Sequence, residues 1–270
     1  MGVRMETRFL RTFALLGALG AVAIAAVLSA SAAAAGELVH FDLDWKQPSQ
    51  CERLGYLARP QGAGTHPAII VLHGSSGFAP ETVLWAERLA SWGYVGLAID
   101  SSEETWGRDC GRGQFRQTFD ALAARRFLIE QPYVSAGRIG VIGFSMGAGS
   151  GLALMERRLT DQSMQAVVAV SPPCAGRAGI VRGPTLILIG ELDELTPAAA
   201  CRDMMARRND EGAELRLLVY PEAHHGFTAP SLKPGRRWGN GWIEYNEAAA
   251  NAAIEETRRF LQATLSEAAH

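Results

Sequence analysis

The 270-residue chain lacks the features that mark several large classes of protein. Its net charge is only −2 and its isoelectric point is about 6.3, so neither nucleic acid nor an anionic membrane surface is an expected partner. It has few cysteines, four in all, and no C-x-x-C spacing that would predict a zinc site. After the N-terminal segment there is no further membrane-spanning run, no internal repeat and no linker that would separate two domains.

The N-terminal segment has the features of an export signal. Three arginines precede an apolar run over residues 13–28, and a stretch of small residues suited to cleavage follows. A membrane anchor is the alternative, but the run is shorter than the roughly 20 residues of a span, and no charged stop-transfer flank follows it. We therefore predict a signal peptide over residues 1–35 and a periplasmic or secreted domain over 36–270, without membrane contact after signal removal.

The four cysteines permit two disulfides in an exported protein. Cys174 follows the end of one predicted strand, and Cys201 lies early in the helix that follows the next strand. Adjacent strands of a sheet would bring these ends together, which favours a Cys174–Cys201 disulfide. Cys51 and Cys110 form the remaining pair.

Apolar runs alternate with helix patterns throughout the predicted domain. The runs lack polar alternation, which is typical of strands buried on both faces of a parallel sheet, and they cover residues 68–72, 95–99, 139–142, 166–170, 185–189 and 215–220. Residues 40–44 and 55–59 predict opening, antiparallel strands, and helices are predicted over residues 80–92, 114–130, 146–158, 197–208 and 242–265. The expected fold is α/β, a single domain with a doubly wound, mostly parallel sheet.

The most informative motif is the pentapeptide Gly143-Phe-Ser-Met-Gly147, which directly follows an apolar strand and precedes a helix pattern. A G-x-S-x-G sequence in this context is typical of a nucleophile elbow, the strained turn that exposes a serine hydroxyl at the end of a sheet. A Cβ atom at either glycine would crowd the turn and the approach of the strand to the helix. Ser145 is therefore the candidate nucleophile of a hydrolase.

A serine nucleophile needs a base, which follows it in the chain order Ser, acid, His. The histidines after Ser145 are His224, His225 and the C-terminal His270, which would be frayed. His224 and His225 follow the strand predicted over residues 215–220, as a catalytic histidine loop should. The residues alone leave the choice between these two open.

The acid should come at the end of the strand before the histidine loop. Glu191, Asp193 and Glu194 all follow the strand that ends near Gly190. We favour Asp193, because the turn after Gly190 has room to direct one acid inward, with Glu194 as the second choice. The other interpretation of an acid here is a favourable charge at a helix N-terminus, and this describes Glu194 best.

The oxyanion formed during attack needs hydrogen-bond donors. The backbone N–H of Met146 is one candidate, and the loop Val71-Leu-His-Gly-Ser-Ser-Gly77 offers the Ser75 N–H as the other. His73 in this loop is expected to be structural, hydrogen-bonding the loop. Two long irregular stretches, 101–113 and 228–241, either shape the entrance to the site or are surface connections.

No cofactor or metal is expected. The glycines after Ser145 lack the G-x-G-x-x-G spacing of a dinucleotide loop. His224 and His225 are adjacent and therefore point in different directions, and no second ligand pair is spaced to complete a metal site with them.

From about residue 40 to 260 the chain resembles the dienelactone hydrolase family of α/β-hydrolases. The resemblance rests on His73-Gly-Ser-Ser-Gly77, Gly143-Phe-Ser-Met-Gly147, Gly190-Glu-Leu-Asp193 and Tyr220-Pro-Glu-Ala-His-His-Gly-Phe227. It implies His225 as the base, because the family's histidine precedes a small residue and Phe. It also implies Asp193 as the acid and the Ser75 and Met146 N–H groups as oxyanion donors.

The chain departs from the family archetype at three places. Ser145 replaces a cysteine nucleophile, Gly74 stands where the archetype has a glutamate, and Thr228-Ala-Pro230 replaces a segment with a substrate-binding arginine. These departures favour a small neutral ester over a dienelactone, with an aromatic part beside Trp106 or Phe78. The resulting hypothesis is an exported serine esterase; a peptidase or amidase on the same scaffold and a non-catalytic binding protein are the alternatives.

Overall fold

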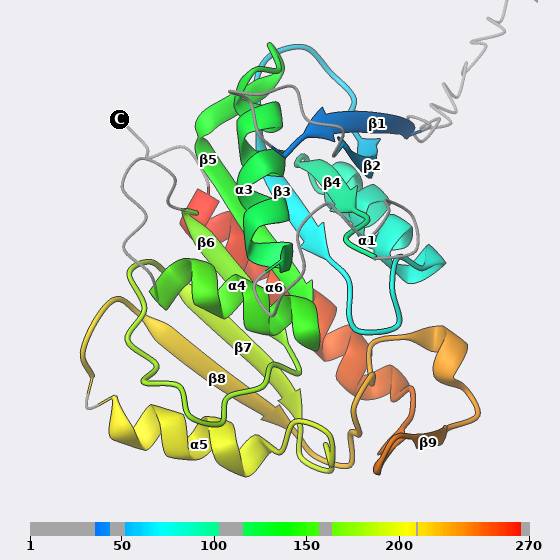
Figure 1. Ribbon diagram of the computed structural model, residues 1–270, viewed down its shortest axis with the longest axis vertical. Coiled ribbons are helices and arrows are strands. Elements are labelled where there is room, and N and C mark those ends of the chain that lie inside the picture. Colours follow the sequence, from blue (N-terminus) through cyan, green and yellow to red (C-terminus); the bar gives the residue numbers. More distant parts are fainter. Residues whose placement is uncertain (1–35, 44–51, 103–115, 157–163, 209, 266–270) are drawn as a thin grey trace, which may run out of the picture. The chain divides into compact units, whose positions relative to one another are not determined.

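An eight-stranded sheet organises the part of the chain that the structure describes (Figure 1). The computed structural model describes residues 36–43, 52–102, 116–156, 164–208 and 210–265, and the chain from residue 33 onward forms one compact unit. The predicted signal peptide, Cys51, Cys110 and Trp106 lie outside the described residues. The signal peptide and the second disulfide therefore stay predictions.

The strands follow the predicted apolar runs closely. Their bounds are β1 Glu37–Asp42, β2 Glu52–Ala58, β3 His66–Leu72, β4 Val95–Ile99, β5 Val134–Phe144, β6 Ala166–Val170, β7 Thr185–Gly190 and β8 Leu215–Tyr220. In the sheet they run β1-β2-β4-β3-β5-β6-β7-β8, with β3 to β8 parallel and β2 antiparallel to both of its neighbours. The predicted mostly parallel sheet with antiparallel opening strands is confirmed.

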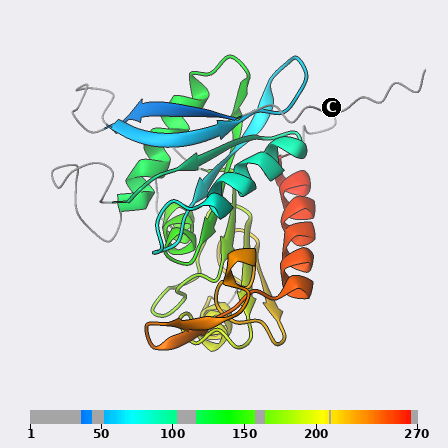
Figure 2. The ribbon, with the colours of Figure 1, turned by 90° about the vertical axis from the view of Figure 1, so that its right-hand side faces the viewer.

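Helices cover both faces of this sheet, as predicted for a doubly wound fold (Figures 1 and 2). They are α1 Pro80–Ser91, α3 Arg116–Ile129, α4 Met146–Glu156, α5 Ala198–Arg207 and α6 Glu247–Leu265. Helices α3, α4 and α5 pack into one hydrophobic cluster, and α1 and α6 pack into another on the opposite face. Successive residues of β3 alternate between the two clusters, Ile69 and Val71 facing one and Ile70 and Leu72 the other. This double burial explains why the strands are apolar at consecutive positions.

The predicted helix over residues 242–265 is wrong in its first five residues. Trp242 lies in β10 (Gly241–Ile243), which pairs antiparallel with β9 (Arg236–Trp238), and α6 begins only at Glu247. Asn246 supplies the helix start, because its side-chain oxygen accepts a hydrogen bond from the Ala249 N–H at 3.0 Å. A short 3-10 helix over Pro230–Leu232 precedes this hairpin. The segment from Thr228 to Asn246, called the arm below, is thus ordered.

The predicted Cys174–Cys201 disulfide is present. It joins the loop after β6 to the first turns of α5, with a Cα–Cα distance of 4.9 Å. Closing a loop of 27 residues restricts the unfolded chain and contributes about 3.5 kcal/mol of stability by the loop-entropy relation. Thr196, in the loop between β7 and α5, donates a hydrogen bond to the Ser171 carbonyl oxygen at 3.1 Å, so the disulfide lies next to the loop that carries Asp193.

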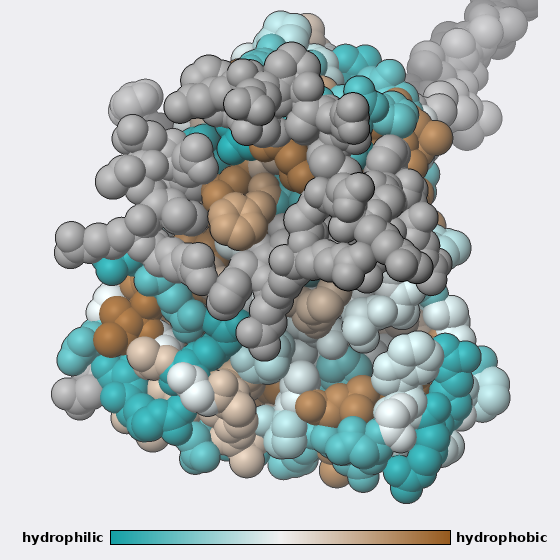
Figure 3. Space-filling model, viewed as in Figure 1, coloured by the Kyte–Doolittle hydropathy of each residue, from teal (hydrophilic) through white to brown (hydrophobic). Residues whose placement is uncertain are grey.

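Large apolar side chains at the surface are scattered. On the face drawn in Figure 3, hydrophobic residues form separate groups among hydrophilic ones. Among the described residues, Met146 and Trp238 are nearly half exposed, and both lie at the site described below. No helix in the described ranges has the length and apolar character needed to cross a membrane.

Candidate active site

The strand-turn-helix around Ser145 has the strained geometry of an elbow. Ser145 sits between β5 and α4 with φ at 51°, a left-handed conformation that non-glycine residues rarely adopt. A Cβ at Gly143 would lie 2.3 Å from the Gly147 carbonyl oxygen, and one at Gly147 would lie 2.6 Å from the Leu72 and His73 carbonyl oxygens. The predicted steric demand for two glycines is therefore confirmed, since neither position has room for a side chain.

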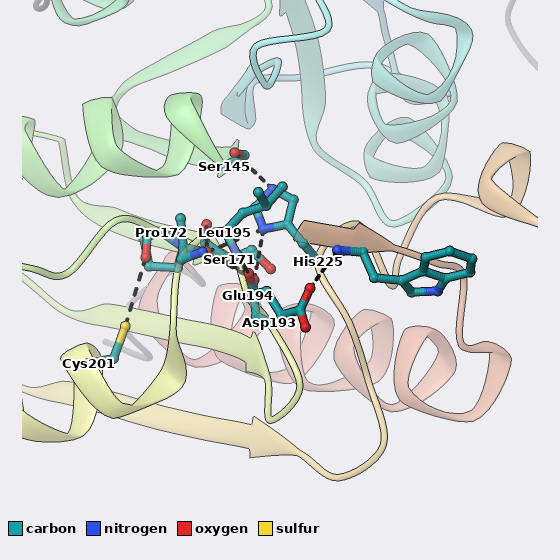
Figure 4. A network of polar contacts seen from close by, with 10 residues as sticks. Ser145, Ser171, Pro172, Asp193, Glu194, Leu195, Cys201 and His225 are labelled. Carbon is teal, nitrogen blue, oxygen red and sulfur yellow. Dashed lines mark hydrogen bonds and ion pairs between the residues drawn. The ribbon is translucent and has the colours of Figure 1, made fainter. Parts of the chain in front are cut away.

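His225 connects the nucleophile candidate to the acid candidate (Figure 4). Its Nε2 lies 3.0 Å from Ser145 Oγ, and its Nδ1 lies 2.8 Å from Asp193 Oδ2. Because the carboxylate only accepts, Nδ1 carries the proton and Nε2 is left to accept from the serine hydroxyl. The three residues predicted as a triad are thus joined in series; their catalytic roles remain predictions. His224 makes no such contact.

The backbone of His225 is fixed by the arm that follows it. His225 forms a parallel bridge with Ile243 of β10, and its carbonyl oxygen accepts a hydrogen bond from the Glu244 N–H at 3.1 Å. The ring is nearly buried, with 9% of the residue exposed. The position of the imidazole therefore depends on an ordered β-segment as well as on the loop after β8.

Asp193 is buried and held by four donors. Its Oδ1 accepts from the Leu195 and Thr196 N–H groups at 3.0 and 2.8 Å, and its Oδ2 lies 2.9 Å from Thr196 Oγ1 as well as next to His225. Burial acts to raise the pKa of Asp193, but the hydrogen bond and charge of His225, together with the Thr196 donors, outweigh it. The net pKa lies below its ordinary value, so the group is a carboxylate at neutral pH.

The two competing acids have other partners. Glu191 is half exposed and lies 3.7 Å from Arg202, whose charge it meets at the surface. Glu194 Oε2 accepts a hydrogen bond from the Trp242 N–H at 2.9 Å and so attaches β10 to the loop that carries Asp193 (Figure 4). The interpretation of Glu194 as a helix-terminal charge misses this hairpin contact, which no local pattern could reveal.

The two predicted oxyanion donors lie beside Ser145. Ser75 belongs to the loop after β3. In this loop the preceding residue, Gly74, lies so close to Ser145 that a Cβ added to it would be 3.5 Å from Ser145 Cβ. Met146 is the first residue of α4. Neither backbone N–H donates a hydrogen bond to another residue in the described part of the chain. A helix N-terminus also carries a partial positive charge, which favours an anion near Met146.

A cavity of about 580 Å³ opens onto Ser145 and His225. Its aromatic walls come from Trp85 of α1, Phe144 of β5 and Trp238 of β9. Trp238 lies in the stretch 228–241 that was one candidate for the entrance, whereas the sequence patterns did not identify Trp85 and Phe144 as cavity residues. Phe78 does not line the cavity and packs against the core instead. The stretch 228–241 does shape the entrance, as one of its two interpretations held, because residues from Thr228 to Gly239 line it.

Comparison with known proteins agrees with this arrangement. The model of the dienelactone hydrolase family matches residues 54–265. The chain belongs to the dienelactone hydrolase family. The match covers every element from β3 to α6, most of β2, and all five predicted site residues.

Relatives of this family member include named ester hydrolases. It is 27% identical over 193 residues to Lipase 1 of Moraxella sp. (strain TA144), covering 70% of this chain and 59% of that protein. It is 28% identical over 138 residues to the bis(hydroxyethyl) terephthalate hydrolase of Streptomyces coelicolor, covering 51% and 43% of the two chains. The chain thus spans about half the length of the curated relatives it matches.

Solved structures support the fold. A putative dienelactone hydrolase from Klebsiella pneumoniae superposes with a TM-score of 0.68 at 20% identity, covering 87% of this chain and all of that one. The α/β-hydrolase fold predicted from the sequence is therefore confirmed, including its single domain.

Proposed function

We propose that this protein is a serine hydrolase that cleaves small carboxylic esters through an acyl-enzyme. The observation that carries the proposal is the continuous hydrogen-bonded series from Ser145 Oγ through the His225 ring to the Asp193 carboxylate, with distances of 3.0 and 2.8 Å. A serine hydroxyl is a weak nucleophile until such a base takes its proton. Family membership and the named lipase and ester hydrolase relatives support the same reaction.

In the proposed reaction, Ser145 Oγ attacks the ester carbonyl carbon while its proton passes to His225 Nε2. The carbonyl π electrons move to oxygen, and the resulting oxyanion accepts hydrogen bonds from the Ser75 and Met146 N–H groups. When the tetrahedral intermediate collapses, the C–O bond to the alcohol breaks and the alcohol leaves with the proton of His225. Water then repeats the sequence on the acyl-enzyme and releases the acid. Asp193 keeps the imidazole in the Nδ1–H form and stabilises the imidazolium.

The cavity supports an ester of modest size with an apolar or aromatic part. Its volume of about 580 Å³ lies within the range of small-molecule sites. Trp85 and Phe144 lie in tilted contact, with ring centroids 5.5 Å apart, and form one apolar wall. No nucleic acid or cofactor has a role in this chemistry.

The proposal includes export, with residues 1–35 as a signal peptide. The Cys174–Cys201 disulfide supports it, since disulfides persist in the oxidising environment outside the cytosol. Expression of the full chain followed by N-terminal sequencing of the exported protein tests it. A mature N-terminus near residue 36 is expected, and a retained, uncleaved leader would contradict it.

Hydrolysis of p-nitrophenyl esters by the wild type and by Ser145→Ala tests the activity itself. We expect a burst of p-nitrophenol equal to the enzyme concentration in the wild type and none in Ser145→Ala, with turnover reduced at least about 10³-fold. A panel of matched p-nitroanilides separates an esterase from a peptidase or amidase, because the latter would turn them over at comparable rates. A binding protein without catalysis would give no burst with any acyl group.

A further inference from the structure

A buried polar network contacts the predicted oxyanion loop, residues 73–77. His73 follows β3, has only 3% of its surface exposed, and accepts a hydrogen bond from the Ser101 N–H at Nε2, 3.0 Å away. Since a backbone N–H only donates, Nε2 is unprotonated and the ring proton lies on Nδ1. Nδ1 is 2.7 Å from the Gly74 carbonyl oxygen, to which it therefore donates.

This tautomer orients the peptide between Gly74 and Ser75. The Gly74 carbonyl is held by the His73 Nδ1–H and also accepts from the Gly77 N–H at 3.2 Å. In a planar trans peptide the C=O and the following N–H point in opposite directions. The Ser75 N–H therefore faces away from the His73 ring, beside the nucleophile, where Gly74 approaches Ser145.

Gln117 of α3 links this loop to the segment that carries the second predicted donor. It is buried, and its Nε2 donates to the His73 carbonyl oxygen at 3.0 Å. Ser150 Oγ donates its single proton to a pair of acceptors, Gln117 Oε1 at 3.4 Å and the Met146 carbonyl oxygen at 3.3 Å, which share it. The 3.3 Å approach of Gln117 Nε2 to His73 Nδ1 brings two donors together and is packing, not a hydrogen bond.

We propose that Gln117 is a positioning residue that sets the spacing between the two oxyanion donors. The inference rests on the proposed function and adds to it a residue outside the triad and the cavity wall. One side-chain amide bridges the chain just before the Ser75 donor and the helix that begins with the Met146 donor. Stabilisation of an oxyanion requires donors within a few tenths of an ångström of their ideal distance, so loss of this bridge weakens the transition state more than the ground state.

The test compares Gln117→Met, which keeps the length of the side chain and removes both hydrogen bonds, with Gln117→Glu, which keeps its shape but loses the amide donor. We expect kcat to fall about 10- to 100-fold, less than the 10²- to 10³-fold typical of deleting a donor itself, and KM to change less than about threefold. The affinity of an alkylboronic acid, which places an oxygen at the oxyanion position, should fall with kcat/KM. The affinity of the alcohol product should not.

Thr118→Val is the matched control. Thr118 is the next residue of α3, equally buried, and its hydroxyl has no hydrogen-bond partner among the described residues. This variant should keep kcat and boronate affinity within about twofold, whatever its melting temperature. If Gln117→Met does not fold, Gln117→Glu carries the same comparison.

Three results would overturn the inference: kcat within threefold of wild type in both Gln117 variants, boronate and alcohol affinities that fall together, or an equal loss in Thr118→Val. These outcomes are distinct from failure of the proposed function, which Ser145→Ala reports. If Ser145→Ala abolishes the burst while the Gln117 variants match the wild type, only the positioning role fails.

Discussion

Replacing Asp193 by asparagine should leave the His225 ring in place but make it unable to act as the base. An amide has one oxygen, whereas the carboxylate uses Oδ1 for the Leu195 and Thr196 N–H groups and Oδ2 for His225. If the amide oxygen takes the Oδ2 place, its NH₂ group faces two partly buried N–H donors. Leaving those two unsatisfied costs about 2 kcal/mol in total, at about 1 kcal/mol each, the low end of the range for buried groups.

The amide oxygen is therefore expected at the Oδ1 place, with the NH₂ group donating to His225 Nδ1. The ring proton then lies on Nε2, and the ring can no longer accept the proton of Ser145. We expect kcat to fall about 10⁴-fold, equivalent to about 5 kcal/mol of transition-state free energy, with KM little changed. Steady-state hydrolysis of a p-nitrophenyl ester measures this directly.

Glu191→Gln is the matched control, because it removes an exposed carboxylate from the same loop. Its kcat should stay within about twofold of wild type. A loss below tenfold in Asp193→Asn would refute the tautomer argument, and so would an equal loss in Glu191→Gln.

The same variant tests the linkage of stability to pH. Burial acts to raise the pKa of Asp193, yet His225 and Thr196 lower it below the ordinary value overall. A lowered folded-state pKa stabilises the protein fully above the ordinary, unfolded pKa, and this contribution is lost as pH falls through the folded pKa. In urea unfolding, the stability gap between wild type and Asp193→Asn should be constant near neutrality and should close in strong acid. A gap that widens in acid would contradict the sign.

Three further predictions concern the disulfide, Trp238 in the cavity wall, and Tyr220 at the end of the edge strand β8. Replacing Cys174 and Cys201 together by alanine should cost about 3.5 kcal/mol in urea unfolding under oxidising conditions, and a loss below 1 kcal/mol would contradict the loop-entropy estimate. Trp238→Ala should raise KM about three- to tenfold for bulky aromatic esters, with little effect on acetyl esters, since Trp238 lines the cavity and is nearly half exposed; equal effects on both would refute this reasoning. Burial and Glu256 raise the pKa of Tyr220 to about 12, and its buried hydroxyl has no partner among the described residues. Tyr220→Phe should therefore stabilise the fold by about 1 kcal/mol. The wild type should lose stability between about pH 10 and 12, because the tyrosine ionises at lower pH in the unfolded chain than in the folded one, and the variant should not show this loss. An alkaline stability profile that is the same in both proteins would exclude Tyr220 as the source of the loss.

Sequence patterns predict local structure well where the backbone geometry or the burial of a segment permits only one kind of residue. The elbow is such a case, because Gly143 and Gly147 are the residues that a strand-turn-helix of this tightness requires. The buried strands are another, since their consecutive apolar residues face two helical layers. The Cys174–Cys201 pair is a third, since the expectation that successive parallel strands lie side by side brings the two cysteines together.

The secondary structure from Thr228 to Asn246 was the main failure of prediction, and the reason is physical. The strands β9 and β10 have three residues each, and β9 is exposed, so they carry no hydrophobic period. Their order comes from contacts with distant segments, such as the Trp242 N–H on Glu194 and the bridge of Ile243 to His225. Trp85 and Phe144 were not predicted to line the cavity for the same reason, since they are remote in sequence from each other and from Trp238.

Mapping a covalent label shows whether Ser145 is a nucleophile that His225 activates. The wild-type protein is treated with a fluorophosphonate and digested, and the modified residue is identified by tandem mass spectrometry, with His225→Ala treated in parallel. We expect a single adduct on Ser145 that forms at least about 10³-fold more slowly in His225→Ala. An adduct on another residue, no adduct at all, or labelling of Ser145 at an equal rate without the imidazole would contradict it.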